Sequence, residues 1–139
     1  MKIKTTTLEI VPGVGFSVQN ITHLVNEFVE STGVQEGQLL LFYKHTTGSL
    51  MIGEHEVGVI ADLERVLETI APTDGNYLHH VREVDFNGYA HIRASLMPIS
   101  ITIPILGGRL TLGTHQEIQV VDNQPEELPR FVVMQIIGE

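Results

Sequence analysis

Three side chains that can bind an anion or transfer a proton occur at alternate positions in residues 90–96. They are His91, Arg93 and Ser95, and apolar residues stand between them. In a β-strand, alternate residues point to the same face, so these three would form one polar row. A guanidinium can hold a phosphate through two hydrogen bonds, and an imidazole accepts a proton or a metal ion. This stretch therefore predicts a strand with an anion-binding face. The alternative is an outer face that contacts only solvent.

A cluster of hydroxyl groups, Thr46, Thr47 and Ser49, surrounds Gly48 directly after His45. The cluster follows an apolar run of strand type. Hydroxyls next to a conformationally permissive glycine can donate hydrogen bonds to phosphate oxygens. We predict that Thr46 and Thr47 bind phosphate, with an ordinary turn as the alternative.

Further imidazoles lie in the polar stretch of residues 72–89. His79 and His80 are adjacent there and precede His91 in the chain. Adjacent side chains point in different directions, so at most one of the pair is expected to share a site with His91. The sequence has no compact metal motif such as HExxH, so a metal site would have to be assembled from separate segments.

Two acidic residues are candidates for a general base or for magnesium ligands. Glu54 precedes a helical pattern, and Asp62 lies inside it but off its apolar stripe. Carboxylates near the start of a helix are also stabilised by the helix dipole, and an exposed acid on a helix needs no function. Spacing alone leaves a catalytic role, a magnesium site and a bland surface role open.

Two helices are predicted from apolar residues at helical spacing. The first covers residues 18–29, with Ser17 as a candidate N-cap and Gly33 as a candidate C-cap. The second covers residues 56–70 and ends at Pro72.

The other patterns are of strand type. They cover residues 2–10, 38–43 with 49–52 as its continuation, 99–105 with strict alternation, 110–112, 118–120, and 131–137, which is apolar enough for burial on both faces. Gly107 and Gly108 supply a tight turn. The prediction is an α+β fold in which two main helices pack on a largely antiparallel sheet or a two-sheet sandwich.

The composition narrows the class of protein. At 139 residues the chain has the length of a single domain, residues 1–139. Its 17 acidic against 8 basic residues argue against a nucleic-acid partner, although a small anion needs only a few converging donors. Disulfides and thiolate metal sites are excluded because cysteine is absent. No apolar run approaches the length of a membrane span, so we expect a soluble cytoplasmic protein without a membrane partner.

Short motifs follow one another along nearly the whole chain: HTTGSL at residues 45–50, Glu54 and Asp62, NYLH at 76–79, AHIRASL at 90–96, GRL at 108–110, GTHQ at 113–116, and the closing Gly138-Glu139. Together they resemble the YjbQ-like family, often described as secondary thiamine-phosphate synthase. The resemblance implies an α+β fold with a β-sandwich-like core, a homotrimer, and a site where His45, His79 and His91 hold a metal ion or an anion. It also implies that Glu54, Asp62, Arg93 and Ser95 are neighbours of that site. His115 stands where family members commonly carry Trp.

The activity that this resemblance implies is a slow thiamine-phosphate synthase-like transfer, which joins a pyrimidine diphosphate to a thiazole phosphate and releases pyrophosphate. Arg93, the Thr46 and Thr47 hydroxyls and a divalent ion would stabilise the leaving group. Imidazoles suit zinc or another transition metal, whereas magnesium would need carboxylates such as Glu54 and Asp62.

Two other functions remain open at this stage. One is metal-dependent hydrolysis of a phosphate or amide, with either acid as the base. The other is non-catalytic binding of a metal ion or a small anion. The expected partner is a small phosphorylated molecule.

Overall fold

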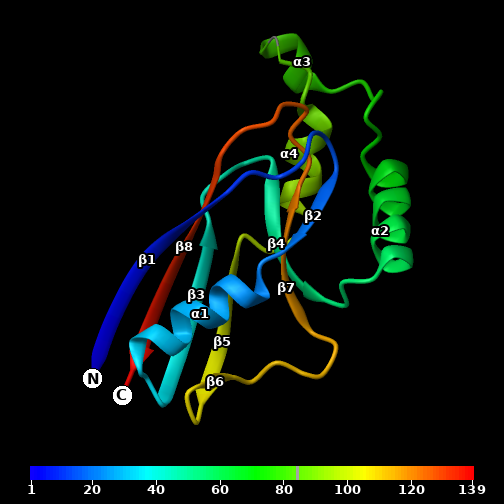
Figure 1. Cartoon of the computed structure of the whole chain (residues 1–139). Helices are drawn as coiled ribbons and strands as arrows, with labels where there is room; N and C mark the ends of the chain where they lie inside the picture. Colours follow the sequence, from blue (N-terminus) through cyan, green and yellow to red (C-terminus); the bar gives the residue numbers. More distant parts are fainter. Residues whose placement is uncertain (84) are drawn as a thin grey trace.

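The computed structural model describes residues 1–83 and 85–139, where eight strands form two antiparallel sheets (Figure 1). The five-stranded sheet has the order β1 (Lys2–Ile10), β8 (Arg130–Gly138), β3 (Glu36–Tyr43), β5 (Ser100–Leu106) and β6 (Arg109–Leu110). The three-stranded sheet has the order β2 (Ser17–Asn20), β7 (Glu117–Asp122) and β4 (Gly48–Gly53).

Four helices lie in the described residues: α1 (Thr22–Thr32), α2 (Val57–Ile70), α3 (Leu78–Arg82) and α4 (Gly88–Ser95). The two longest, α1 and α2, correspond to the two predicted helices. The predicted fold class, α+β with a largely antiparallel sheet and two main helices, is therefore confirmed.

The hydrophobic core is built from the inward faces of the strands. Leu39 lies opposite Ile136 and Leu41 opposite Met134 in the β3–β8 register, and all four are at most 3% exposed. The alternation of buried and accessible residues in β3 reflects the two-residue period of a strand. Each buried aliphatic side chain contributes roughly 1.5–3 kcal/mol relative to an exposed one, so this core fixes the frame of the molecule.

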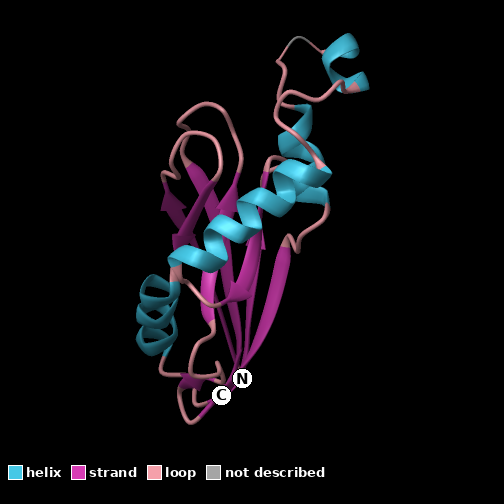
Figure 2. Cartoon of the chain, turned by 90° about the vertical axis from the view of Figure 1, so that its right-hand side faces the viewer, coloured by secondary structure: helices cyan, strands magenta, loops and turns pink. Residues whose placement is uncertain are grey.

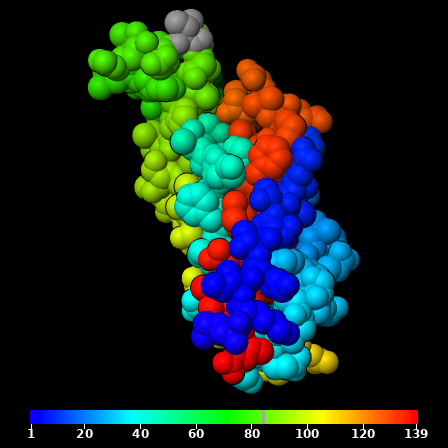
Figure 3. Space-filling view, turned by 90° about the vertical axis from the view of Figure 1, so that its left-hand side faces the viewer, coloured from blue at the N-terminus to red at the C-terminus, as the bar shows by residue number. Residues whose placement is uncertain are grey.

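The opposite face of the five-stranded sheet is open in this chain. Figure 3 shows side chains of β1, β8 and β3 next to one another on this surface. Leu40 and Phe42 of β3 are 37% and 41% exposed there, and Ile3 of β1 is 65% exposed.

Helix α2 crosses in front of the strands in Figure 2. It begins after Glu56, whose carboxylate accepts the N–H groups of Gly58 and Val59 at 2.8 Å. It ends at Ile70 with Ala71 as its C-cap, because the residue before a proline, here Pro72, disfavours the helical conformation. Its inner side buries Leu67.

The strand predicted for residues 90–96 is wrong, because the segment lies in α4. Its alternation covers only seven residues, and alanine, arginine and leucine also favour helices. In the helix, Ala90 and Arg93 are buried on one side. His91 and Ser95 are four residues apart and share another side, so the expected row of three polar groups on one face does not form.

Two other predictions about local structure are wrong in their boundaries. Ser17 starts strand β2 and caps no helix, and Asn20 Oδ1 accepts the Thr22 N–H at the start of α1. Residues 49–52 belong to β4 in the other sheet and do not continue β3. The predicted C-cap is confirmed, since Gly33 has a φ of 66°.

The last strand also differs from its prediction, because β8 has fully buried residues only at alternate positions. Its other face is half-buried and belongs to the open side of the sheet. The glycine turn is confirmed, with φ angles of 57° at Gly107 and 75° at Gly108 between β5 and β6.

The two chain termini lie together, far from the short helix α3. In Figure 1 the first and last residues are neighbours at one end of the molecule, and α3 projects at the opposite end, with α4 between α3 and the strands. None of the helices in the described residues is long and apolar enough to cross a membrane.

Candidate metal centre

His79, Asp85 and His91 bring three potential ligand atoms within 4.8 Å of one another. His79 Nε2 lies 3.0 Å from Asp85 Oδ1, and the two imidazole centroids are 4.7 Å apart in an edge-to-face arrangement. His79 comes from α3, His91 from α4, and Asp85 from the segment between them. The cluster is therefore assembled by the turn that joins the two short helices.

Packing at Gly88 fixes this turn. A Cβ at this position would lie 2.7 Å from Cβ of Tyr77 and 2.9 Å from His80 Nε2, so only glycine fits. The Gly88 N–H donates to His80 Nε2 at 2.9 Å. His80 thus holds the start of α4, while its neighbour His79 faces His91.

Asn87 stands at the centre of the cluster. With its amide nitrogen turned toward the cluster, Nδ2 lies 3.0 Å from Asp85 Oδ1, 3.1 Å from His79 Nε2 and 3.3 Å from His91 Nε2. Three acceptor atoms thus converge on one point, where they meet a donor. Two imidazole nitrogens and one carboxylate oxygen are also the ligand set of many catalytic zinc sites. This set of two nitrogens and one oxygen is one that a transition-metal ion accepts.

His45 lies outside this cluster and makes other contacts. The Phe131 N–H donates to His45 Nε2 at 2.8 Å, and Arg130 Nη1 lies 3.3 Å from His45 Nδ1. The acceptor nitrogen of the neutral ring is therefore already used. Burial, and then the charge of Arg130, lowers the pKa of His45, so the imidazole is held neutral.

A buried polar network supports His45 and Thr47. Arg130 pairs with Asp122 at 3.2 Å and donates to Thr47 Oγ1 at 2.9 Å. The Tyr43 hydroxyl donates to Asp122, and burial together with this carboxylate raises the pKa of Tyr43. Thr47 is 4% exposed, so its hydroxyl faces Arg130 in the interior.

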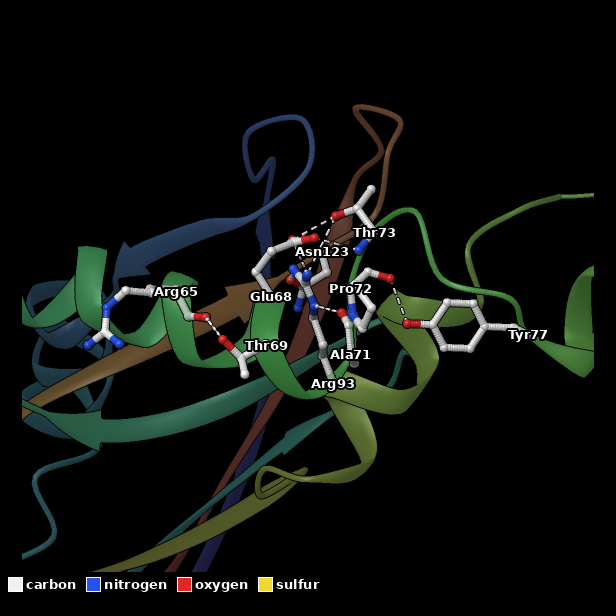
Figure 4. A network of polar contacts seen from close by, with 9 residues as sticks. All are labelled: Arg65, Glu68, Thr69, Ala71, Pro72, Thr73, Tyr77, Arg93 and Asn123. Atoms are coloured by element: carbon white, nitrogen blue, oxygen red, sulfur yellow. Dashed lines mark hydrogen bonds and ion pairs between the residues drawn. The ribbon is translucent and has the colours of Figure 1, made fainter.

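Arg93 is also engaged in the interior, as Figure 4 shows. Only 2% exposed, it donates from Nε to Ala71 O at 3.0 Å and from Nη1 to Asn123 Oδ1 at 3.1 Å. Its Nη2 forms an ion pair with Glu68, and its guanidinium lies 5.0 Å from the centroid of the Tyr89 ring. These contacts direct the guanidinium toward protein groups and away from the cavity beside His91.

The other predicted site residues are dispersed. Thr46 and Ser95 line one cavity with His45 and His91, although the Ser95 hydroxyl also donates to His91 O at 2.8 Å. Glu54 is exposed at the end of β4. Asp62 is exposed on α2 and pairs with Arg65 at 3.3 Å.

Two cavities meet at His91. One, of about 420 Å³, lies between His91 and the loop of His45 and Thr46. The second, of about 570 Å³, lies on the side of His79 and is bordered by Tyr77, Leu78 and Ile92. A molecule in the first cavity would contact His91, and a molecule in the second would contact both His79 and His91.

Sequence reasoning missed Asp85 and Asn87 as members of the cluster. Asn87 precedes His91 by four residues, a spacing that brings two side chains together only in a helix. A strand over residues 90–96, as predicted, does not bring side chains four positions apart together, so the prediction did not group Asn87 with His91. Asp85 carried no periodic signal, because it lies in the turn between two helices.

Comparisons with known proteins give consistent results. A family model described as UPF0047 protein YjbQ-like matches residues 6–139. A UPF0047 protein of Methanothermobacter thermautotrophicus is 34% identical over 118 residues, which cover 85% of this chain and 81% of the relative. One of Synechocystis is 33% identical over 126 residues, which cover 90% and 86%.

Solved structures share the same fold. A protein of unknown function from Sulfolobus solfataricus superposes with a TM-score of 0.92 at 27% identity, covering 99% of both chains. An uncharacterised protein from Clostridium acetobutylicum has a TM-score of 0.85 at 34% identity, covering 95% of this chain and 99% of the other.

Proposed function

This chain belongs to the YjbQ-like UPF0047 family, and on that premise we propose that it is a metal-dependent enzyme acting on a small phosphorylated molecule. The observation that carries the proposal is the convergence of His79, Asp85 and His91 next to two cavities. The mixed nitrogen and oxygen donor set favours zinc or another transition metal over magnesium, which prefers oxygen ligands alone. A divalent ion bound there would act as a Lewis acid toward a phosphate oxygen.

The groups of the chain itself supply binding and orientation. His91 borders both cavities, so it can contact a ligand in either one. The hydroxyls of Thr46 and Ser95 border the cavity on the side of His45 and can hydrogen-bond phosphate oxygens. The neutral ring of His45 adds no charge to that wall. Arg93 and Thr47 have interior partners, so their predicted role as phosphate ligands is not part of this proposal.

The reaction implied by the family resemblance is thiamine-phosphate synthase-like transfer, in which a pyrimidine diphosphate joins a thiazole phosphate and pyrophosphate leaves. Two adjoining cavities provide space for two substrates with His91 between them. Thr46 and Ser95 would then orient the diphosphate.

Hydrolysis of a phosphate or amide is a second candidate, and the ligand set favours it. Two histidines and one carboxylate are typical of zinc-dependent hydrolases. Glu54 and Asp62 are exposed and lie outside the cluster, so neither is assigned as the base.

A homotrimer is part of the proposal, because the resemblance implies it. Apolar side chains that share one accessible side of α2 support an assembly of copies: Val59, Val66 and Ile70 are 42%, 42% and 59% exposed. The open face of the five-stranded sheet supports it in the same way.

Metal analysis and two activity assays test the proposed function. Protein purified without a histidine tag is expected to contain about one zinc or other transition-metal ion per chain. Thiamine phosphate formation and a screen of phosphoesters and amides then separate transfer from hydrolysis. The His91→Ala variant should lose metal and activity, whereas the control His115→Ala, which changes an exposed histidine, should retain both. Full activity of metal-free protein would refute the proposal, and metal binding without turnover would leave only a binding role.

A further inference from the structure

The contacts of Arg93 connect three separate parts of the chain. Its backbone belongs to α4, two residues after His91. Its side chain reaches Glu68 and Ala71 at the end of α2, and Asn123 just after β7. One side chain therefore ties α4 to the end of α2 and to the segment that follows β7 (Figure 4).

Glu68 extends this connection to the segment that follows α2. Its carboxylate accepts the Thr73 N–H at 2.7 Å and the Thr73 hydroxyl at 2.9 Å, in addition to the Arg93 guanidinium. The hydrogen bond from the Thr73 N–H has the largest effect, and together with the other hydrogen bonds it lowers the pKa of Glu68. The carboxylate is therefore ionised opposite Arg93. Nearby, the Tyr77 hydroxyl donates to Pro72 O at 2.7 Å.

The segment held in this way leads directly to the cluster. Residues 72–77 connect α2 to α3, which carries His79, and Asp85 follows α3. His91 lies on α4, the helix that carries Arg93. The His80–Gly88 hydrogen bond holds α3 against the start of α4, and the contacts of Arg93 attach residues 68–77, which lead into α3, to the same helix.

We propose that Arg93 is a positioning residue of the metal centre, which attaches residues 68–77 to α4 and so holds His79 and Asp85 against His91. The metal part of this inference rests on the proposed function, but the attachment itself does not. A buried guanidinium with several partners suits this role, because removing it takes a donor from Asn123 and from the Ala71 carbonyl and takes the ionic partner from Glu68.

The test compares Arg93→Met and Arg93→Lys with the control Arg65→Met. Arg65 lies on the same helix as Glu68 but is 70% exposed, and its side chain pairs with the exposed Asp62. Zinc affinity is measured by competition with a chromophoric chelator, and backbone hydrogen exchange is followed by mass spectrometry.

Arg93→Met should weaken zinc binding by up to about 10-fold, less than the loss of a group that is hydrogen-bonded directly to a metal ligand. Hydrogen exchange should accelerate in residues 72–77 and 88–95 and stay unchanged in β3 and β8. Arg93→Lys keeps the charge but not the fork of donors, so it should recover part of the affinity. Arg65→Met should match the parent protein in both measurements.

Unchanged exchange in residues 72–77 and 88–95 of Arg93→Met would overturn the inference. If the parent protein binds no zinc, the proposed function fails, and the exchange measurement alone still decides whether Arg93 attaches these segments. If Arg93→Met does not fold, Glu68→Gln replaces it, because that variant removes the ionic partner at the half-exposed end of the same contact. Unchanged exchange in Glu68→Gln would equally overturn the inference.

Discussion

His91 and His45 border the same cavity but are held in different ways. His91 faces another imidazole and a carboxylate, an arrangement that attracts a cation. His45 receives a backbone N–H and lies beside a guanidinium, an arrangement that repels a cation. Residue type alone therefore did not determine which histidines form the cluster. Their hydrogen-bond partners did.

The carboxylate of the cluster can be tested without changing its shape. The Asp85→Asn variant keeps the volume of the side chain but removes the negative charge, so zinc affinity should fall at least about 10-fold. Asp74→Asn, which changes an exposed acid in the connection between α2 and α3, is the control and should leave affinity unchanged. Chelator competition measures both, and equal affinities in the two variants would exclude Asp85 as a ligand.

Stability should depend on pH through His45. Its pKa is lowered in the folded protein, so the unfolded chain binds more protons at mildly acidic pH. The free energy of unfolding is therefore expected to fall as pH decreases below the ordinary histidine pKa of about 6.5 and on toward the lower pKa of the folded state.

Urea unfolding between pH 5 and 8 checks this pH dependence. The His45→Gln variant should show a flatter profile than the parent protein over this range. A parallel pair of profiles would contradict the prediction, because other groups would then cause all of the slope.

Individual elements differ in how well their sequence specifies them. The alternation in residues 99–105 correctly predicted β5, and the apolar stripe of residues 56–70 correctly predicted α2, because each pattern is long enough to exclude the other period. Residues 90–96 are too short for this, and their helix is selected by burial of Tyr89, Ala90 and Arg93 against distant segments. Tertiary contacts of this kind leave no periodic signal in the sequence.

The N-terminus of α4 should tolerate no side chain at Gly88. Gly88→Ala would bring a methyl group within 2.7 Å of Tyr77 Cβ, and it should lower the free energy of unfolding by about 1–3 kcal/mol through overpacking. Gly53→Ala is the control, since its nearest contact would be an ordinary 3.7 Å from Gln119 Nε2. Urea denaturation compares the two, and equal stabilities would show that the turn relaxes without cost.

Adjacent residues of β5 provide a test of the core. Ile103→Ala removes a side chain that is 3% exposed, and it should cost about 2–5 kcal/mol. Thr102→Ala, on the accessible face, should cost about 1 kcal/mol or less. Denaturant unfolding measures both, and similar losses would contradict the assignment of inner and outer faces.

At the scale of the whole molecule, the open sheet face and the accessible side of α2 leave large apolar side chains in contact with solvent. A chain of 15.4 kDa normally covers such surfaces in an assembly. The resemblance to the YjbQ-like family predicted a trimer from the sequence, but no local pattern specified which surfaces meet.

Sedimentation equilibrium tests the assembly. The parent protein is expected to have three times the mass of the 15.4 kDa chain. Val66→Glu places a charge on the accessible side of α2 and should shift the equilibrium toward single chains, whereas Glu64→Gln should not. A parent protein that sediments as a single chain at micromolar concentration would refute the trimer.

The end of β7 connects the surroundings of His45 to the helix that carries His91. Asp122 pairs with Arg130, which lies beside His45, and the adjacent Asn123 accepts a hydrogen bond from Arg93 of α4. Either arginine would lose a buried partner if its neighbour at positions 122–123 changed alone. In an alignment of relatives, we therefore expect positions 93 and 123 to covary, and positions 122 and 130 to covary as a second pair. Evolution of the two histidine environments would then be linked through two consecutive codons.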